Sequence, residues 1–204
     1  MKLVALSGSR SERSKTLLVV NKAIDYAKDY DPQIETEIIH LGDYDIQYCD
    51  GRDPSLYQGD TKKVIDLIVN ADAFIVGTPI YRGSMTGALK NVFDIIPNDS
   101  LRGKVIGFIA TGGSPHHFLA IEHQLKPLAG YFHAYALPSA VYAHNDHFSA
   151  STLVDTEIMN RLNELGKSIV DFYNKGMDRS VRLGLPDIPR KQLSNYEEGY
   201  CGKA

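Results

Sequence analysis

The sequence lacks several features that define large classes of protein. It has only two cysteines, Cys49 and Cys201, which lie far apart and outside any C-x-x-C pair. This usage is typical of incidental thiols in a reducing compartment. A disulfide between the two cysteines is the alternative. No apolar run is long enough to span a bilayer, and a strand that starts directly after Met1 leaves no room for a signal peptide. We therefore expect a cytoplasmic protein with no membrane partner.

Several kinds of ligand site are also missing. The net charge of -3 at pH 7 offers no basic stripe to a nucleic-acid backbone. Neither G-x-x-x-x-G-K-[ST] nor G-x-G-x-x-G occurs, so the usual nucleoside-triphosphate and dinucleotide fingerprints are absent. The seven histidines include no H-x-x-x-H pair with acidic support, and only His144 and His147 have a spacing that suits a pair of ligands. We expect neither a nucleic-acid partner nor a metal.

Strand and helix patterns alternate along the chain. The 204 residues, 43% of them hydrophobic, suit one domain with a sizeable core. Strands are predicted over residues 3–6, 34–41, 74–77, 104–111 and 139–142, and helices over 17–30, 61–70, 86–96, 116–125 and 155–173. Pro138 interrupts the last strand region, and Pro127 is expected to disturb the fourth helix. This alternation predicts an α/β fold, with a parallel sheet between helices on both faces and ligands beyond the carboxyl ends of its strands.

The most informative stretch follows the first strand, over residues 7–16. It reads S-G-S-R-S-E-R-S-K-T and leads directly into a helix. Backbone N–H groups at a helix start lack intrahelical partners, and hydroxyl and basic side chains surround them here. A phosphate is the favoured ligand. The alternative is an ordinary loop in which Ser11 or Ser14 only caps the helix.

Two further loops have the same place relative to a strand and a helix. Residues 78–91 read T-P-I-Y-R-G-S-M-T-G-A-L-K-N, in which Pro79 and Gly83 stiffen the loop and Tyr81 offers an aromatic platform. Thr86 is the expected N-cap of the helix that follows. The third loop, T-G-G-S-P, begins at Thr111. Because all three loops follow parallel strands, they converge at one sheet edge, which favours a flat aromatic ligand that carries a phosphate.

Together these motifs resemble the NADPH-dependent FMN reductases of flavodoxin-like fold. The similarity rests on G-S-R-S-E-R-S, on the second loop and on A-T-G-G-S-P-H-H, and L-A-I-E-H-Q-L-K-P-L matches the reductases of two-component alkanesulfonate monooxygenases. Thr86 stands where the family usually has serine, so the hydroxyl is kept. The resemblance implies a three-layer sandwich with a five-stranded sheet of order 2-1-3-4-5 over residues 1–175. Residues 176–204 are then a C-terminal tail that docks on a neighbouring subunit or is disordered.

The resemblance also assigns roles to the three loops. The first would bind the 5′-phosphate of FMN, the second would lie along the isoalloxazine ring, and the third would flank its pyrimidine side or the ribityl chain. NADPH (or NADH) would pass a hydride to flavin N5, so no catalytic side chain is assigned. The cofactor-binding residues implied in this way are Ser9, Arg10, Ser14, Lys15, Thr16, Pro79, Ile80, Tyr81, Arg82, Gly83, Thr111, Gly112, Gly113 and Ser114.

One position in the fourth helix has two interpretations. In the alkanesulfonate-linked reductases the matching helix carries one inserted residue, which forms a π-bulge at a subunit interface, and the family links this feature to flavin that exchanges as a substrate. His123 stands at that position, where tyrosine is frequent. A plain interface histidine in a regular helix is the equally weighted alternative.

The resemblance implies a reductase that transfers hydride from NADPH to FMN and supplies the reduced flavin to a monooxygenase, acting as a homodimer or homotetramer. A reductase with tightly bound FMN that acts on quinones, azo dyes or metal oxyanions would use the same loops. A flavodoxin-type electron carrier is a further alternative, which the near-neutral charge and the T-P-x-Y loop disfavour. A nucleotide-binding regulator without turnover also stays open, because ligand loops can persist where chemistry does not.

Overall fold

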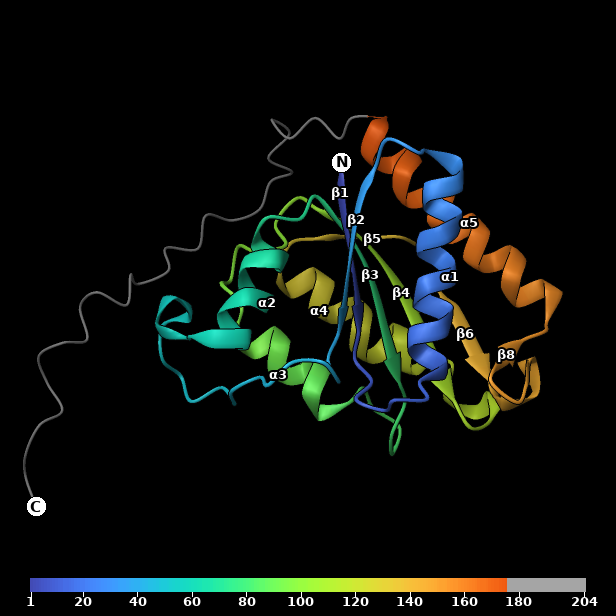
Figure 1. Cartoon of the computed structure of the whole chain (residues 1–204), viewed down its shortest axis with the longest axis horizontal. Coiled ribbons are helices and arrows are strands. Elements are labelled where there is room, and N and C mark those ends of the chain that lie inside the picture. The colour runs from blue at the N-terminus through green and yellow to red at the C-terminus, as the bar shows by residue number, and fades with distance from the viewer. Residues whose placement is uncertain (176–204) are drawn as a thin grey trace, which may run out of the picture.

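The computed structural model describes residues 1–175, and the predicted tail over 176–204 lies outside the described residues. One sheet organises this part of the chain (Figure 1). Its strands are β1 (Lys2–Ser7), β2 (Glu35–His40), β3 (Ala73–Pro79), β4 (Val105–Gly112), β5 (Tyr135–Ala136) and β6 (Val141–His144). All of their pairings are parallel, and the order is β2-β1-β3-β4-β5, with β6 also on β4. The predicted order 2-1-3-4-5 is confirmed.

The fifth strand differs from its prediction because it consists of two pieces. Tyr135–Ala136 pairs with the start of β4, and Val141–His144 pairs with its end. Between them, Leu137 donates its backbone N–H to Ile106 at 2.9 Å, and Pro138 follows. Proline has no N–H to continue the ladder, so pairing stops there and resumes at Val141, two residues later than predicted.

Helices cover both faces of the sheet. They are α1 (Lys15–Tyr30), α2 (Gly59–Val69), α3 (Gly87–Ile95), α4 (Lys126–Tyr131) and α5 (Thr156–Asn174). Helices α1 and α5 lie together on one face, and α2, α3 and α4 lie on the other (Figure 1). Shorter elements are the 3-10 turns Pro54–Leu56, Pro115–His117 and Asn145–His147 and the hairpin of β7 (Phe148–Ser149) and β8 (Thr152–Leu153). No helix among the described residues is long and apolar enough to cross a membrane.

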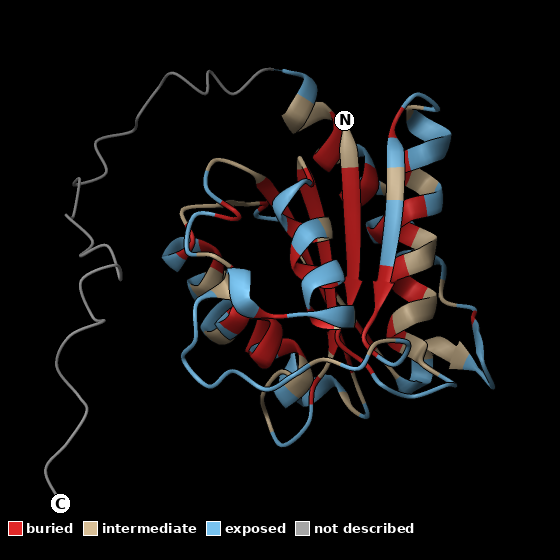
Figure 2. Ribbon diagram, turned by 60° about the vertical axis from the view of Figure 1, so that its left-hand side comes forward, coloured by how far each residue is buried: buried red, intermediate tan, exposed pale blue. Residues whose placement is uncertain are grey.

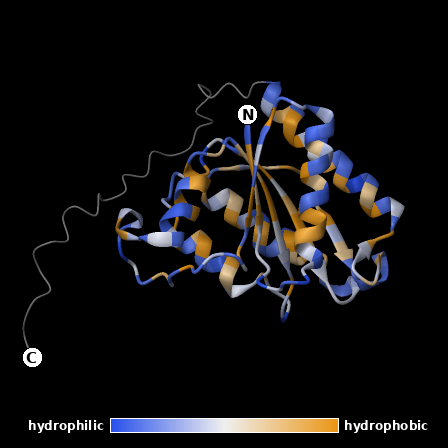
Figure 3. Cartoon of the chain, in the orientation of Figure 1, coloured by the Kyte–Doolittle hydropathy of each residue, from blue (hydrophilic) through white to orange (hydrophobic). Residues whose placement is uncertain are grey.

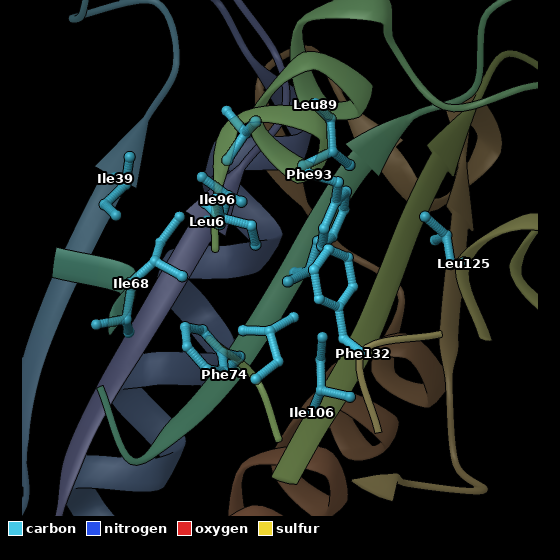
Figure 4. Close-up of a cluster of buried hydrophobic side chains, with 14 of the residues drawn as sticks. Leu6, Ile39, Ile68, Phe74, Leu89, Phe93, Ile96, Ile106, Leu125 and Phe132 are labelled. Atoms are coloured by element: carbon cyan, nitrogen blue, oxygen red, sulfur yellow. The ribbon is translucent and has the colours of Figure 1, made fainter. Parts of the chain in front are cut away.

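Two apolar cores hold these layers together. The strands of the sheet are mostly buried, whereas the outer sides of the helices are exposed (Figure 2) and hydrophilic (Figure 3). In the core under α2, α3 and α4, leucine, isoleucine and phenylalanine side chains from the helices meet those of the sheet (Figure 4). Phe93 and Phe132 lie with ring centroids 5.9 Å apart in this core. This packing fixes the strands, and therefore the loops at their ends.

The fourth helix runs further than predicted. Residues Ile121–Leu125 form a π-helical segment, and α4 then continues through Pro127 to Tyr131. The Lys126 N–H bonds to the carbonyl of Ile121, five residues back. In a regular α-helix the Pro127 ring would crowd the carbonyl four residues before it, and the wider π turn relieves that contact. Pro127 therefore disturbs the regular α-helical pattern, as predicted, but it does not end the helix.

Candidate functional site

The carboxyl ends of β1, β3 and β4 lie side by side at one edge of the sheet. In the register, Ser7 is opposite Gly77, and Pro79 is opposite Thr111. The chain leaves all three strands at this edge, so the three loops singled out in the sequence start there (Figure 1). The convergence expected from the parallel order is therefore present.

Backbone and hydroxyl groups tie the three loops to one another. The Gly8 N–H donates to the Gly77 carbonyl at 2.7 Å, and the Ile80 N–H donates to the Thr111 carbonyl at 2.7 Å. The buried Thr86 hydroxyl donates to the Gly8 carbonyl at 2.7 Å and accepts from the Leu89 N–H, which makes Thr86 the N-cap of α3 as predicted. The edge is thus one connected structure.

The first loop ends in a capped helix. The Ser14 hydroxyl accepts from the Leu17 N–H at 3.0 Å, which confirms Ser14 as N-cap of α1. The buried Ser9 hydroxyl accepts from the Ser11 N–H at 3.2 Å, and Arg10 is exposed beside it. The cap fixes the first turn of α1 toward the sheet edge, where its free N–H groups and helix dipole favour an anion.

A buried pair of hydroxyls joins the start of α1 to the end of β4. Thr16 and Thr111 hydrogen-bond through their side-chain oxygens at 2.6 Å. Both residues are among the predicted contacts, and the structure gives each hydroxyl a protein partner. The pair fixes the start of α1 against the end of β4.

We expect this pair to behave as a unit in a double-mutant cycle. Thr16→Val or Thr111→Val alone leaves one buried hydroxyl without its partner and should lower the free energy of unfolding by about 1–2 kcal/mol. The double variant removes both groups and should lose less than the sum of the two. Urea denaturation of the four proteins measures this difference, and strictly additive losses would contradict it.

The second loop is a tight turn that leaves one aromatic ring exposed. Tyr81 and Ser84 exchange backbone hydrogen bonds of 2.8 and 3.1 Å, and Arg82 and Gly83 between them have φ of 54° and 80°. Two successive left-handed residues are typical of a type I′ turn. The Tyr81 side chain is 58% exposed, and Ile80 behind it is buried. The ring therefore stands at the edge as a platform.

A residue that the sequence did not single out holds this turn. Gln124 donates its amide to the Gly83 carbonyl at 2.9 Å, and its amide oxygen accepts from the Ser84 hydroxyl. Gln124 belongs to the same π-helical segment as His123. The π conformation weighed for His123 is therefore present, and the segment positions the second loop.

The third loop is supported by another unpredicted residue. The Tyr142 hydroxyl donates to the Ser114 carbonyl at 2.7 Å, and burial raises the pKa of this phenol, so it stays a donor at neutral pH. A Cβ on Gly112 would lie 2.0 Å from the Tyr142 hydroxyl oxygen. Glycine is therefore required at position 112 for this contact. The Ser114 hydroxyl itself lies 3.2 Å from Nδ1 of His116.

The backbone of the second and third loops has free space beside it at Gly83 and Gly113. A Cβ on Gly83 would meet no atom within 4 Å, and one on Gly113 would meet only the Asn145 amide nitrogen, at 3.8 Å. A flat ligand can therefore approach both backbones closely. With the exposed Tyr81 ring and the first turn of α1, this surface fits a ring system that carries a phosphate.

Other candidate features lie elsewhere or are absent. A depression of about 440 Å³ lies on the outer side of α1, lined by Glu12, Ser14, Leu17, Leu18, Asn21, Lys22 and Asp25. It lies away from the second and third loops. Residues 1–175 contain no group of three or more His, Cys, Asp or Glu side chains that could hold a metal ion. Cys49 is exposed, and Cys201 lies outside the described residues.

The strand order, the helices on both faces and the three joined loops define a protein of flavodoxin-like fold with a ligand edge. The model of the family of NADPH-dependent FMN reductases matches residues 1–148. The chain therefore belongs to this family of oxidoreductases, for which FMN and a nicotinamide nucleotide are the cofactors.

Individual relatives agree with this assignment. An NAD(P)H-dependent FAD/FMN reductase of Geobacillus thermodenitrificans is 45% identical over 174 residues, which cover 85% of this chain and 94% of the relative. The NADH-dependent FMN reductase SfnF of Pseudomonas fluorescens is 36% identical over 149 residues, or 73% and 79% of the two chains. The apo crystal structure of the NADH:FMN oxidoreductase EmoB is 29% identical, with a TM-score of 0.74 and coverage of 93% and 99%.

Proposed function

We propose that this protein is an NAD(P)H:FMN reductase that binds flavin at the edge formed by the three loops and releases it reduced to a flavin-dependent monooxygenase. The observation that carries the proposal is the set of hydrogen bonds that join the loops of β1, β3 and β4 around an open backbone surface. Family membership supports the two cofactors. When bound, the flavin supplies the ring that accepts the hydride.

Each loop then has a part in binding. The first turn of α1, with Ser9, Arg10, Ser14, Lys15 and Thr16, holds the flavin phosphate through N–H groups, hydroxyls and charge. The second loop, Pro79 to Gly83, lies along the ring, with Tyr81 beside it. Thr111, Gly112, Gly113 and Ser114 border the polar side of the ring, where backbone groups can hydrogen-bond. Residues of this chain thus bind and orient the flavin, and none is assigned as acid or base.

We also propose a homodimer or homotetramer in the cytoplasm. Phe118 and Leu119, shortly before the π-helical segment, are 54% and 47% exposed, and Tyr131, at the end of α4, is 59% exposed. Neighbouring large apolar side chains that are exposed, as at 118 and 119, favour a subunit interface. The use of a nicotinamide nucleotide supports the cytoplasmic location. The relatives include enzymes named for NADH and for NAD(P)H, so either donor suits the proposal.

The proposal is tested by anaerobic mixing of the purified protein with NADPH or NADH and FMN. We expect one flavin reduced for each nicotinamide oxidised, and flavin that is removed by dialysis. Lys15→Ala should raise the KM for FMN about three- to tenfold, because a cation beside a phosphate is lost. It should leave the KM for riboflavin, which has no phosphate, nearly unchanged.

Lys28→Ala, in the last turn of the same helix, is the matched control and should change neither KM. Absence of NAD(P)H oxidation with any flavin would refute the proposal. A yellow protein that keeps FMN through dialysis would favour the reductase with tightly bound FMN. If stopped-flow measurements detect no direct hydride transfer, an electron carrier would be favoured instead.

A further inference from the structure

A fourth segment reaches the flavin edge beside the first and third loops. It follows β6 and comprises the turn Asn145–His147 and the first residue of the β7–β8 hairpin, Phe148. The Lys15 ammonium donates to the Asn145 side-chain oxygen at 2.9 Å and lies 4.9 Å above the Phe148 ring. On its other side, Asn145 borders Gly113 of the third loop. We call Lys15, Asn145, His147 and Phe148 the outer surface of the site.

Three side chains of this surface carry hydrogen-bond donors. Nδ1 of His147 accepts the His144 backbone N–H at 3.1 Å, so the neutral His147 ring carries its proton on Nε2 and can donate there. The His144 and His147 rings lie with centroids 3.9 Å apart and planes tilted by 49°, and the exposed Asp146 carboxylate lies 3.6 Å from Nδ1 of His144. With Lys15 and Asn145, the surface offers ammonium, amide and imidazole donors beside the helix start.

We propose that the outer surface binds the adenylate half of FAD, so that this enzyme accepts FAD as well as FMN. The inference rests on the proposed function, which places the flavin phosphate at the first turn of α1. The second phosphate of FAD is joined to the first by one bridging oxygen, so it must lie next to that turn. Lys15 and Asn145 occupy that position, and Phe148 is the aromatic ring beyond them.

The contact between Lys15 and Phe148 also explains how the Phe148 ring becomes free to stack on adenine. An ammonium binds a phosphate more strongly than it binds an amide oxygen or a phenyl face, because the phosphate carries full charge. Flavin phosphates at the first turn of α1 would therefore draw Lys15 away from Phe148, and the vacated face can stack on the adenine of FAD. Stacking of a base on an aromatic side chain is a strong and sequence-independent contact.

The other side of the first loop is less suitable for a diphosphate. The depression along α1 contains Lys22, but the carboxylates of Glu12 and Asp25 flank it. Two carboxylates thus face one ammonium there, whereas on the outer surface the nearby carboxylate, Asp146, lies beside the His144 ring. The relative from Geobacillus thermodenitrificans is named for both FAD and FMN, which agrees with room for the larger flavin.

The test compares Phe148→Leu with Tyr26→Leu. Both rings are partly buried against the same core, and each lies under a lysine ammonium, at 4.9 Å for Lys15 and 5.0 Å for Lys22. Tyr26→Leu therefore controls for the loss of a partly buried ring under a lysine. Only Phe148→Leu should raise the Kd and KM for FAD, by about tenfold. Fluorescence titration with FMN and FAD, and steady-state assays with both flavins, measure the difference.

The outcomes separate the inference from the proposed function. The inference is supported if Phe148→Leu weakens FAD about tenfold, keeps the Kd for FMN within twofold and leaves the KM for NADPH unchanged. Equal loss for FMN and FAD, or no loss for FAD, would overturn it while FMN reduction continues. A rise in the KM for NADPH alone would assign the surface to the nicotinamide nucleotide instead. If the wild-type protein binds and reduces no flavin, the proposed function itself fails, and the inference falls with it.

Discussion

Replacing Thr86 with valine is expected to lower the free energy of unfolding by about 2–4 kcal/mol, the combined cost of a lost N-cap and an unpaired buried carbonyl. The Thr86 hydroxyl does two things at once. It accepts the Leu89 N–H at the start of α3, and it donates to the Gly8 carbonyl. Valine has nearly the same shape but provides neither bond. The loss of stability in Thr86→Val therefore reports on the hydroxyl and not on side-chain packing.

The same change should weaken flavin binding. Gly8 is held from two sides, by Thr86 at its carbonyl and by Gly77 at its N–H. Losing the first contact loosens the first loop against the second, so we expect the KM for FMN to rise about tenfold or more, as expected when binding groups are mispositioned. Urea denaturation and steady-state kinetics measure the two effects.

Thr86→Ser is the matched control for this prediction. Serine keeps the hydroxyl, so it should retain both hydrogen bonds. We expect less than about 1 kcal/mol of lost stability, the scale of one buried methyl group, and an unchanged KM. If serine and valine are equally harmful, the hydroxyl does not join the loops as described.

Local signals predicted the elements that start at this edge. Thr86 caps the helix for which it was expected, and Ser14, one of the two candidates with Ser11, caps α1, because a cap depends on a short side chain directly before an apolar helical pattern. The strand order followed from alternation together with the family resemblance. The caps therefore depend only on residues that are neighbours in sequence.

The supporting residues could not be found in this way. Tyr142 bonds to a residue 28 positions away, Gln124 to one 41 positions away, and Asn145 to one 130 positions away. Their side chains act on backbone or charge that only the fold brings near, and nothing in their own neighbourhood marks them. The split of the last strand had a visible cause in Pro138, but the pairing of Tyr135–Ala136 depends on β4, which sequence patterns do not place.

Replacing Gly77 with alanine should disrupt the packing of α1 on the sheet. A Cβ there would lie 2.4 Å from Cγ2 of Val20 and 3.2 Å from Cγ2 of Thr16, both on α1. Contacts this short force the helix away from the sheet, and overpacking of this kind should cost about 3 kcal/mol of stability. Because Thr16 moves with the helix, its bond to Thr111 and the first turn of α1 should shift as well. The KM for FMN is expected to rise together with the loss of stability.

A second substitution tests whether this overlap is the cause. Val20→Ala removes the methyl group nearest to the new Cβ. Alone it creates a cavity and should destabilise the protein, but in the Gly77→Ala background it should stabilise it, so the sign of its effect reverses. Gly130→Ala is the control, since a Cβ at this helical position would meet no atom within 4 Å and alanine favours the helix. If Val20→Ala destabilises both backgrounds equally, the damage at position 77 arises from something other than the contact between β3 and α1, and the first turn of α1 is not positioned by that glycine.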